Sequence, residues 1–254
     1  ARQASLDAVV AKGFDGQTYR GTTWGVVVIK DGKIVAERYE GGFNAHMPAR
    51  TNSMCKSLAA TVVGVGVKKG LVDIHKKAPL AEWRRPGDPR GQITINDLLH
   101  MASGLYTEAA GDPQPELYTG GAAAADLSAL NTMDSAPGAR FVYAGSDTIL
   151  SVRAVRQAVN DDARFWTFPF EEILWKTGMT RTYPETDWNG DFMMSGQCWS
   201  TARDFGRFGL LYINDGVWSR ERILPEGWAK YVGTRSPANP AYGAQFWVYG
   251  GRKG

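Results

Sequence analysis

The segment that most constrains the fold is SMCKSLAATVVGVGVKK, residues 53–69, which is apolar on nearly every side when wound as a helix. It ends in two lysines, and Gly70 follows, which is typical of a helix end. A helix that is hydrophobic all round is stable only when other elements cover it, so we expect this one at the centre of the molecule. Its apolar stretch, Leu58 to Val67, is shorter than the roughly 18 residues that a membrane span needs, and we therefore expect no span.

The segments on either side predict a hairpin, several helices and a last strand. Two β-rich runs, residues 24–30 and 33–39, are separated by Asp31-Gly32, which is a strong hairpin signal. Thr94-Ile-Asn-Asp97 predicts a capping box at the start of a helix. Further helices are predicted at residues 3–12, 148–160, 201–214 and 225–232, a strand at residues 241–249, and an irregular excursion at residues 105–127.

This order of elements predicts an α/β protein of the α+β type. We expect an antiparallel sheet built from both ends of the chain and flanked by helices, with a mostly helical lobe inserted between them. Residues 1–45 and 200–254 would form the sheet lobe, and residues 46–199 would form the helical lobe that begins with the central helix. At 254 residues, the chain is long enough to bury a substantial core.

Charge and cysteine content exclude several classes of partner. The formal net charge is +3 and the 29 Lys and Arg form no basic stripe, so we expect no nucleic-acid partner. Cys55 and Cys198 lie far apart, without a Cys-x-x-Cys pair or a histidine at ligand spacing, so we expect neither a metal site nor a cofactor. One disulfide could form, but Cys55 lies inside a helical run and is more simply interpreted as a small buried hydrophobe.

Ser53-Met-Cys-Lys56 places a serine and a lysine at positions i and i+3 where the central helix begins. Such positions share a face, with Cβ atoms roughly 5–6 Å apart, so the lysine amine can reach the serine hydroxyl. A serine hydroxyl becomes a good nucleophile only when a base takes its proton. Lysine titrates at about 10.4, and burial beside an apolar helix lowers its pKa by penalising the charged form. The helix start also offers N–H groups and a dipole that favour negative charge at Ser53.

Four segments follow one another in an informative order: TNSMCKS, then ITINDLLHMASGL, then PGARFVYAGSDT, then CWSTARDFGRFGLLYINDG. Together they resemble the serine β-lactamase and penicillin-recognising superfamily, and within it the class C-type esterases and amidases, such as carboxylesterases and aminohexanoate-oligomer hydrolases. The resemblance implies a β-lactamase-like fold and a serine hydrolase that acts on a small ester or amide through an acyl-enzyme. It also implies that Ser53 is the acylated nucleophile and Lys56 its partner. Tyr143 would share the proton with the lysine and then protonate the leaving group. Tyr106, Ser146 and Trp199 flank these segments and are candidates for substrate binding.

The chain departs from the family in two places. The second motif is usually Tyr-x-Asn, but here it is Tyr143-Ala144-Gly145, and glycine has no amide side chain to hold a β-lactam. This favours the ester and amide branch. The third motif, Lys-Thr-Gly or His-x-Gly, lies on a strand after the segment matched by residues 242–251, and Gly254 comes before such a strand is complete. We therefore expect a further C-terminal segment, or a second fragment, to complete the sheet and supply one N–H of the oxyanion hole.

Other functions stay open. A Ser-His-Asp hydrolase is disfavoured because the chain has no Gly-x-Ser-x-Gly elbow and because His46, His75 and His100 all precede its middle. A β-lactamase or a D-alanyl-D-alanine peptidase would use the same acyl-enzyme chemistry. A penicillin-recognising module that binds without turnover would agree with the missing third motif. The sequence does not identify the compartment.

Overall fold

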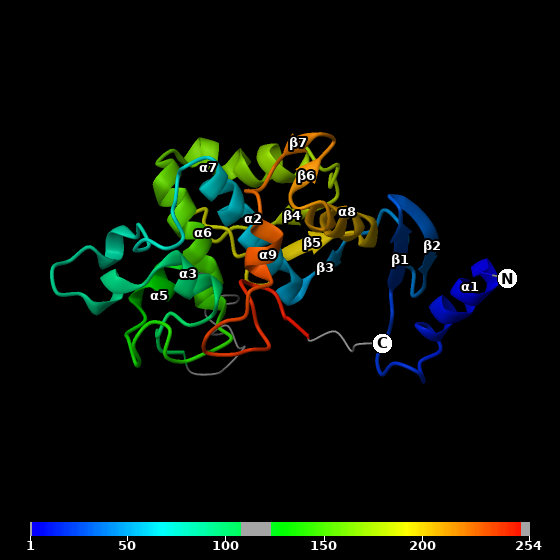
Figure 1. Cartoon of the computed structure of the whole chain (residues 1–254), viewed down its shortest axis with the longest axis horizontal. Coiled ribbons are helices and arrows are strands. Elements are labelled where there is room, and N and C mark those ends of the chain that lie inside the picture. Colours follow the sequence, from blue (N-terminus) through cyan, green and yellow to red (C-terminus); the bar gives the residue numbers. More distant parts are fainter. Residues whose placement is uncertain (1, 108–122, 250–254) are drawn as a thin grey trace.

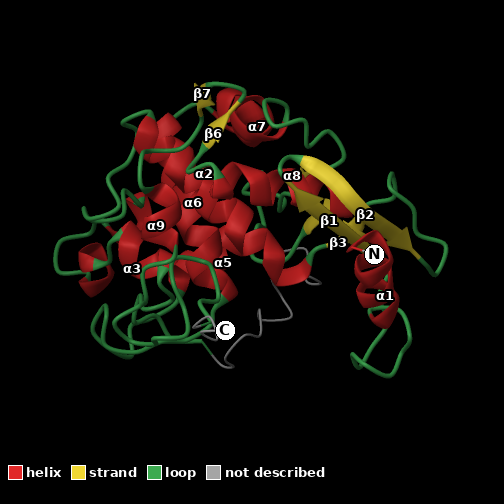
Figure 2. Cartoon of the chain, turned by 45° about the vertical axis from the view of Figure 1, so that its right-hand side comes forward, coloured by secondary structure: helices red, strands yellow, loops and turns green. Residues whose placement is uncertain are grey.

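The computed structural model describes residues 2–107 and 123–249. Most helices gather around α2 (Cys55–Lys68), while the hairpin β1 (Gly25–Lys30) and β2 (Lys33–Tyr39) lies to one side, with α1 (Arg2–Lys12) against it (Figures 1 and 2). A small antiparallel sheet of order β3-β5-β4 lies between the hairpin and the helices. The remaining elements are β3 (Ala49–Arg50), η1 (Asn52–Met54), η2 (Ala81–Trp83), η3 (Pro89–Gln92), α3 (Ile95–Leu99), α5 (Ala124–Leu130), α6 (Gly145–Val159), α7 (Asp162–Pro169), η4 (Phe170–Leu174), β4 (Tyr183–Pro184), β5 (Cys198–Ser200), α8 (Ala202–Ile213), β6 (Val217–Trp218), β7 (Glu221–Arg222) and α9 (Trp228–Val232).

The central helix is confirmed. Nearly all of α2 is buried, and α6 packs along it. Its two glycines allow this close packing. A Cβ on Gly64 would lie 2.6 Å from the ring of Trp228 in α9, and one on Gly66 would lie 3.2 Å from Val72. The helix ends as predicted, because Gly70 adopts a φ of +69° and its N–H donates to the carbonyl of Val67.

The predicted hairpin is also confirmed. Asp31 and Gly32 both have positive φ values, 51° and 73°, which is the backbone that a two-residue type I′ turn requires. The helix α8 packs on β1, and Gly206 permits the approach because a Cβ there would meet Ile29 at 2.6 Å. The chain therefore brings a helix from its last quarter onto a hairpin from its first.

Two predicted helices differ in their bounds. The capping box at Thr94 is present, with hydrogen bonds in both directions between Thr94 and Asp97, but the helix it starts, α3, ends at Leu99. The helix predicted from residue 148 begins at Gly145, so that Tyr143 lies just before its N-cap, Ala144. The irregular excursion predicted at residues 105–127 falls mostly outside the described residues, and its last part is α5.

The strand predicted at residues 241–249 is wrong. A half-buried strand would alternate buried and exposed side chains, but residues 242–245 are all buried. Gln245 has a φ of +63°, and the chain folds back so that Tyr242 pairs with Trp247 in a single bridge. In the described residues, the C-terminal part of the chain adds no strand to the β1–β2 sheet, so the expected sheet from both chain ends is not observed there. What stands of the predicted class is a mixture of helices and antiparallel strands.

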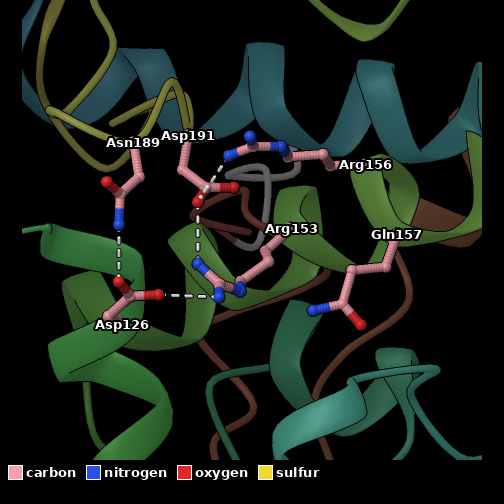
Figure 3. A pocket seen from close by; sticks show the side chains of 6 residues that line it. All are labelled: Asp126, Arg153, Arg156, Gln157, Asn189 and Asp191. Atoms are coloured by element: carbon pink, nitrogen blue, oxygen red, sulfur yellow. Dashed lines mark hydrogen bonds and ion pairs between the residues drawn. The ribbon is translucent and has the colours of Figure 1, made fainter. Parts of the chain in front are cut away.

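An ion-pair network fixes the second half of α6. Arg153 pairs with Asp126 of α5 and with Asp191 at 2.7 Å each, and it also contacts Glu82 of η2. Arg156 pairs with the same oxygen of Asp191 at 2.8 Å. A pocket of about 370 Å³, drawn in Figure 3, is lined by Asp126, Arg153, Arg156 and Asp191 together with Gln157 and Asn189. The network ties α6 to α5, to η2 and to the loop that contains Asp191.

In residues 2–107 and 123–249, no helix combines the length and the apolar character that crossing a membrane requires. The division into a sheet lobe and a helical lobe stays a prediction.

Candidate active site

The predicted nucleophile lies on the turn that leads into α2. Ser53 belongs to the 3₁₀ turn η1, and its side chain is exposed to solvent. The residue before it, Asn52, has a φ of +48°, in the left-handed region that residues other than glycine seldom adopt. Backbone strain of this kind concentrates at functional sites, where the surrounding structure holds it in place.

Lys56 lies beneath this turn in a dry environment. Its side chain is 4% exposed, and its Nζ donates a hydrogen bond of 2.5 Å to the backbone carbonyl of Ser195. The same Nζ lies 4.9 Å from the centre of the Tyr143 ring. Burial penalises the ammonium and lowers the pKa of Lys56 to about 8. A lysine in this state can accept a proton near neutral pH.

Tyr143 reaches the same place from the start of α6. Its side chain is half-buried, and burial raises the pKa of its phenol. Hydrogen bonds from the side chains of Ser53 and Trp247 act in the opposite direction, because donors stabilise the phenolate. The structure thus brings the three predicted catalytic side chains together, Ser53 on the surface turn, Lys56 below it and Tyr143 beside both.

The expectation of an unpaired Cys55 is wrong. Cys55 and Cys198 form a disulfide, with Cα atoms 5.7 Å apart, and both residues are buried. Cys55 does lie on the buried side of α2, as expected, but β5 runs next to that side. Residues 195–198 also make two hydrogen bonds to this part of the chain. The Cys198 carbonyl accepts one from the N–H of Thr51, and the Ser195 carbonyl accepts one from the amine of Lys56. The nucleophile turn is therefore tied to residues 195–198 by one covalent bond and two hydrogen bonds.

Two residues near the site were not predicted from the sequence, Gln245 and Trp247. Gln245 is buried, and its amide nitrogen donates to the carbonyls of Leu98 and Leu99, while its amide oxygen accepts from Thr148 of α6. Its backbone carbonyl accepts from Ser57, the residue after Lys56. The turn of residues 242–247 is thus anchored to three helices, and it carries Trp247 to the Tyr143 ring, with centroids 5.4 Å apart.

A buried carboxyl lies one turn after Tyr143. Burial raises the pKa of Asp147 to about 7, although the Ser103 hydroxyl donates to this carboxyl at 2.7 Å. The pair joins the first turn of α6 to the loop of residues 101–106.

The three predicted substrate-binding residues are placed differently. Tyr106 is 47% exposed and precedes residues 108–122, which lie outside the described residues. Ser146 is buried in the first turn of α6. Trp199 follows Cys198 on β5, where alternate side chains face opposite ways, and its indole donates to Glu185 at 2.8 Å. None of the contacts described for these residues joins them to Ser53, Lys56 or Tyr143, so their role in binding stays a prediction.

The histidines do not form an alternative centre. His46 and His75 are exposed, and the His100 ring lies between the carbonyls of Asn96 and Thr234 at 3.0 and 3.3 Å. In the described ranges, no group of three or more histidine, cysteine or acidic side chains is placed to hold a metal ion.

The mixture of helices and antiparallel strands around the central apolar helix is a penicillin-binding-like fold, as its similarity to solved structures shows. Residues 6–254 match the model of the Beta-lactamase family, and the chain belongs to that family. The resemblance predicted from the four segments is therefore confirmed.

Individual relatives are distant. The chain is 25% identical over 258 residues to the 6-aminohexanoate-dimer hydrolase of Paenarthrobacter ureafaciens, a match that covers 90% of this chain and 64% of that protein. A solved structure from Bacillus anthracis, provisionally named a 6-aminohexanoate-dimer hydrolase, has a TM-score of 0.75 at 21% identity, covering 98% of this chain and 69% of its own. A D-stereospecific amidohydrolase from Streptomyces has a TM-score of 0.62 at 17% identity, covering 83% and 73%. At these identities, the solved structures show the fold.

Proposed function

We propose that this protein is a serine hydrolase that cleaves a small ester or amide through an acyl-enzyme on Ser53. The observation that carries the proposal is the environment of Lys56, a buried amine bonded to a neutral carbonyl one turn from an exposed serine. With its pKa at about 8, roughly a tenth of this amine is neutral at pH 7. Structural lysines are rarely kept in this state, whereas a catalytic base requires it.

The reaction follows from the three side chains. The Ser53 oxygen attacks the carbonyl carbon of the substrate while its proton passes to the Lys56–Tyr143 pair. The bond between that carbon and the leaving oxygen or nitrogen then breaks, and Tyr143 gives the leaving group its proton. Water attacks the resulting ester of Ser53, the same pair accepts the water proton, and Ser53 regains its hydrogen as the acid departs.

The ester and amide branch is favoured over β-lactams. Gly145 is the first residue of α6, two positions after Tyr143, and has no side-chain amide to offer a ligand there. Two of the similar proteins are named for amide hydrolysis, the 6-aminohexanoate-dimer hydrolase and the D-stereospecific amidohydrolase. Short-chain nitrophenyl esters should therefore be turned over more readily than a chromogenic cephalosporin. A higher specificity constant for the cephalosporin would favour the β-lactamase alternative.

We also propose that strands from outside these 254 residues complete the site. Within the described residues β1 pairs with β2 alone, which leaves its second edge without a strand partner. A groove of about 730 Å³ separates β1 from the nucleophile turn and is lined by Val26, Met54 and Phe205 among others. A strand in this groove would extend the sheet and place a second N–H donor near Ser53. If the 254-residue chain alone is monomeric, stably folded and fully active on esters, this part of the proposal fails.

The test of the proposal is covalent labelling. The protein is treated with a serine-directed fluorophosphonate, its intact mass is measured, and the modified residue is located by peptide mapping. Labelling at Ser53 that disappears in Ser53→Ala supports the proposal. Labelling that persists in this variant, or that maps to Ser57 or Ser146, contradicts it. Labelling without any turnover of esters would favour the alternative of a module that binds without hydrolysis.

A further inference from the structure

The turn of residues 242–247 brings an indole to the catalytic tyrosine. The Trp247 ring lies 5.4 Å from the Tyr143 ring, and the Trp247 side chain, like that of Ser53, acts to lower the pKa of the Tyr143 phenol. Tyr242 packs edge-on against both rings, at 5.8 Å from Tyr143 and 4.9 Å from Trp247. Tyr143 is therefore enclosed by two aromatic rings on one side, while Lys56 faces its ring.

The position of Trp247 is fixed by the protein. Gln245, two residues earlier, is bonded to α3 and α6 through its side chain and to α2 through its backbone carbonyl. Tyr242 and Trp247 form the bridge that closes the turn, and Val248 donates to the carbonyl of Ala241. These contacts hold the backbone on both sides of Trp247 and so restrict where its indole can lie. A residue that positions another residue must itself be held in this way.

We propose that Trp247 is a positioning residue for Tyr143, donating its indole N–H to the phenol oxygen so that this oxygen can take the proton of Ser53. The inference rests on the proposed function and deepens it. A fixed donor stabilises the oxygen when negative charge develops on it, as preorganised donors do at other reacting oxygens. Trp247 is also 46% exposed, so it lies where the site opens to solvent.

The experiment uses Trp247→Phe, which retains a ring but removes the N–H donor. The rate at which the fluorophosphonate reacts with Ser53, forming a phosphonate ester with loss of fluoride, is measured across pH as the probe of serine activation. Lys56 and Tyr242 are the titratable groups in contact with Tyr143, and neither is altered. We expect acylation about tenfold slower at neutral pH, which is what one hydrogen bond to a charged oxygen contributes. Losing a donor raises the pKa of the phenol, so the part of the pH profile that the phenol controls should move up by about one unit, while the part that Lys56 controls stays in place.

Trp166→Phe is the matched control. Trp166 is 45% exposed, and its indole donates to the Gly190 carbonyl at 3.1 Å, away from the site. This variant removes an indole donor of similar exposure and should leave the rate and its pH profile unchanged.

Two further measurements separate positioning from folding. In a Tyr143→Phe background the phenol oxygen is absent, so Trp247→Phe should cause no further loss of acylation. In the protein with Trp247 intact, the indole N–H resonance of Trp247 should shift when Tyr143→Phe removes its acceptor.

The outcomes are distinguishable. If the unaltered protein is not labelled at Ser53, the proposed function fails, and this inference fails with it. If Ser53 is labelled but Trp247→Phe keeps the wild-type rate and pH profile, or slows Tyr143→Phe as much as it slows the wild type, the inference alone is overturned.

Discussion

Two regions of this molecule each bury a basic side chain, Lys56 in one and Arg153 in the other, and they differ in the groups that surround its charge. Lys56 donates to the neutral carbonyl of Ser195 and faces the ring of Tyr143, and in the described residues no carboxylate pairs with it. Arg153 is 13% exposed at its side chain, but it pairs with carboxylates on α5 and in the loop of Asp191 (Figure 3), and it also contacts Glu82 of η2.

The pKa values follow the surroundings. Burial lowers the pKa of Lys56 to about 8 because the ammonium loses its water, and in the part of the chain that the structure describes no carboxylate pairs with it to compensate. Burial also acts to lower the pKa of Arg153, but Asp191 and Glu82 more than offset it, and the net shift is upward. The difference teaches that burial alone does not decide the role of a cation. Without counter-ions the buried amine of Lys56 loses its proton more easily, and with them the guanidinium of Arg153 stays charged and holds its neighbours.

The largest expected effect is on stability and concerns the disulfide. The region around Lys56 is held by the Cys55–Cys198 bond, whereas the region around Arg153 is held by ion pairs. Replacing both cysteines, Cys55→Ala with Cys198→Ala, should lower the free energy of unfolding by about 4 kcal/mol, because the bond closes a long loop in the unfolded chain. Urea denaturation of the oxidised wild type and the variant measures this. Wild type unfolded in the presence of reductant is the control and should resemble the variant. Equal stability of all three would show that the disulfide contributes nothing.

The next effect concerns the base. Lys56→Ala and Tyr143→Phe should each slow acylation of Ser53 by about 10² or more, since each removes part of the proton-transfer pair. The double variant should lose much less than the product of the two effects, because residues that act as a unit are not additive. Rates of phosphonate labelling are measured for the wild type, the two single variants and the double variant, which together form the double-mutant cycle. Full additivity would mean that the two groups work independently.

Arg153→Ala tests the second region, the ion-pair network around Arg153. It leaves Asp191 buried with only Arg156 to pair with, and we expect a loss of about 2 kcal/mol in the free energy of unfolding. The acylation rate per folded molecule should stay at the wild-type value, because the network lies away from Ser53. Denaturant unfolding and labelling of the same sample check both statements. A variant that is stable but slow to acylate would place the network in the catalytic machinery.

The smallest effect is in the pH profile. Only the neutral amine accepts a proton, and the pKa of Lys56 is about 8. Acylation should therefore fall about fivefold from pH 8 to pH 7, because the neutral fraction of the Lys56 amine falls from about one half to about one tenth. The sign for stability follows from the same shift. The pKa in the folded state is below that in the unfolded state, so the folded protein gains stability as pH rises from about 8 towards 10.4. Lys56→Met, which has no titrating group, should lack this gain, and an identical gain in both proteins would contradict the assignment.

Local signals in the sequence predicted much of the fold. The Asp31-Gly32 turn, the cap at Thr94 and the glycine after α2 depend on neighbouring residues alone, and each was found as expected. The convergence of Ser53, Lys56 and Tyr143 came from the family resemblance combined with helical spacing.

The predictions that were wrong concern features that depend on contacts between residues far apart in the sequence. The preference of the aromatic residues in 241–249 for a strand was outweighed by the bonds of Gln245 to the carbonyls of Leu98 and Leu99. The disulfide joins residues 143 positions apart, and nothing near Cys55 indicates its partner. The acceptor for Lys56 is a backbone carbonyl, which any residue at position 195 would provide. Sequence pattern cannot identify such a group.

The hydrogen bonds of Gln245 have a consequence for local unfolding of the protein. Residues 242–247 are a turn without regular secondary structure, a kind of segment whose amides usually exchange their hydrogens quickly. Opening this turn, however, would strip partners from α2, α3 and α6 at once. The Gln245 amide, itself bonded to the Leu99 carbonyl, should then exchange only when the surrounding helices open. In cooperative terms, the last described turn of the chain belongs to the same unfolding unit as the nucleophile helix.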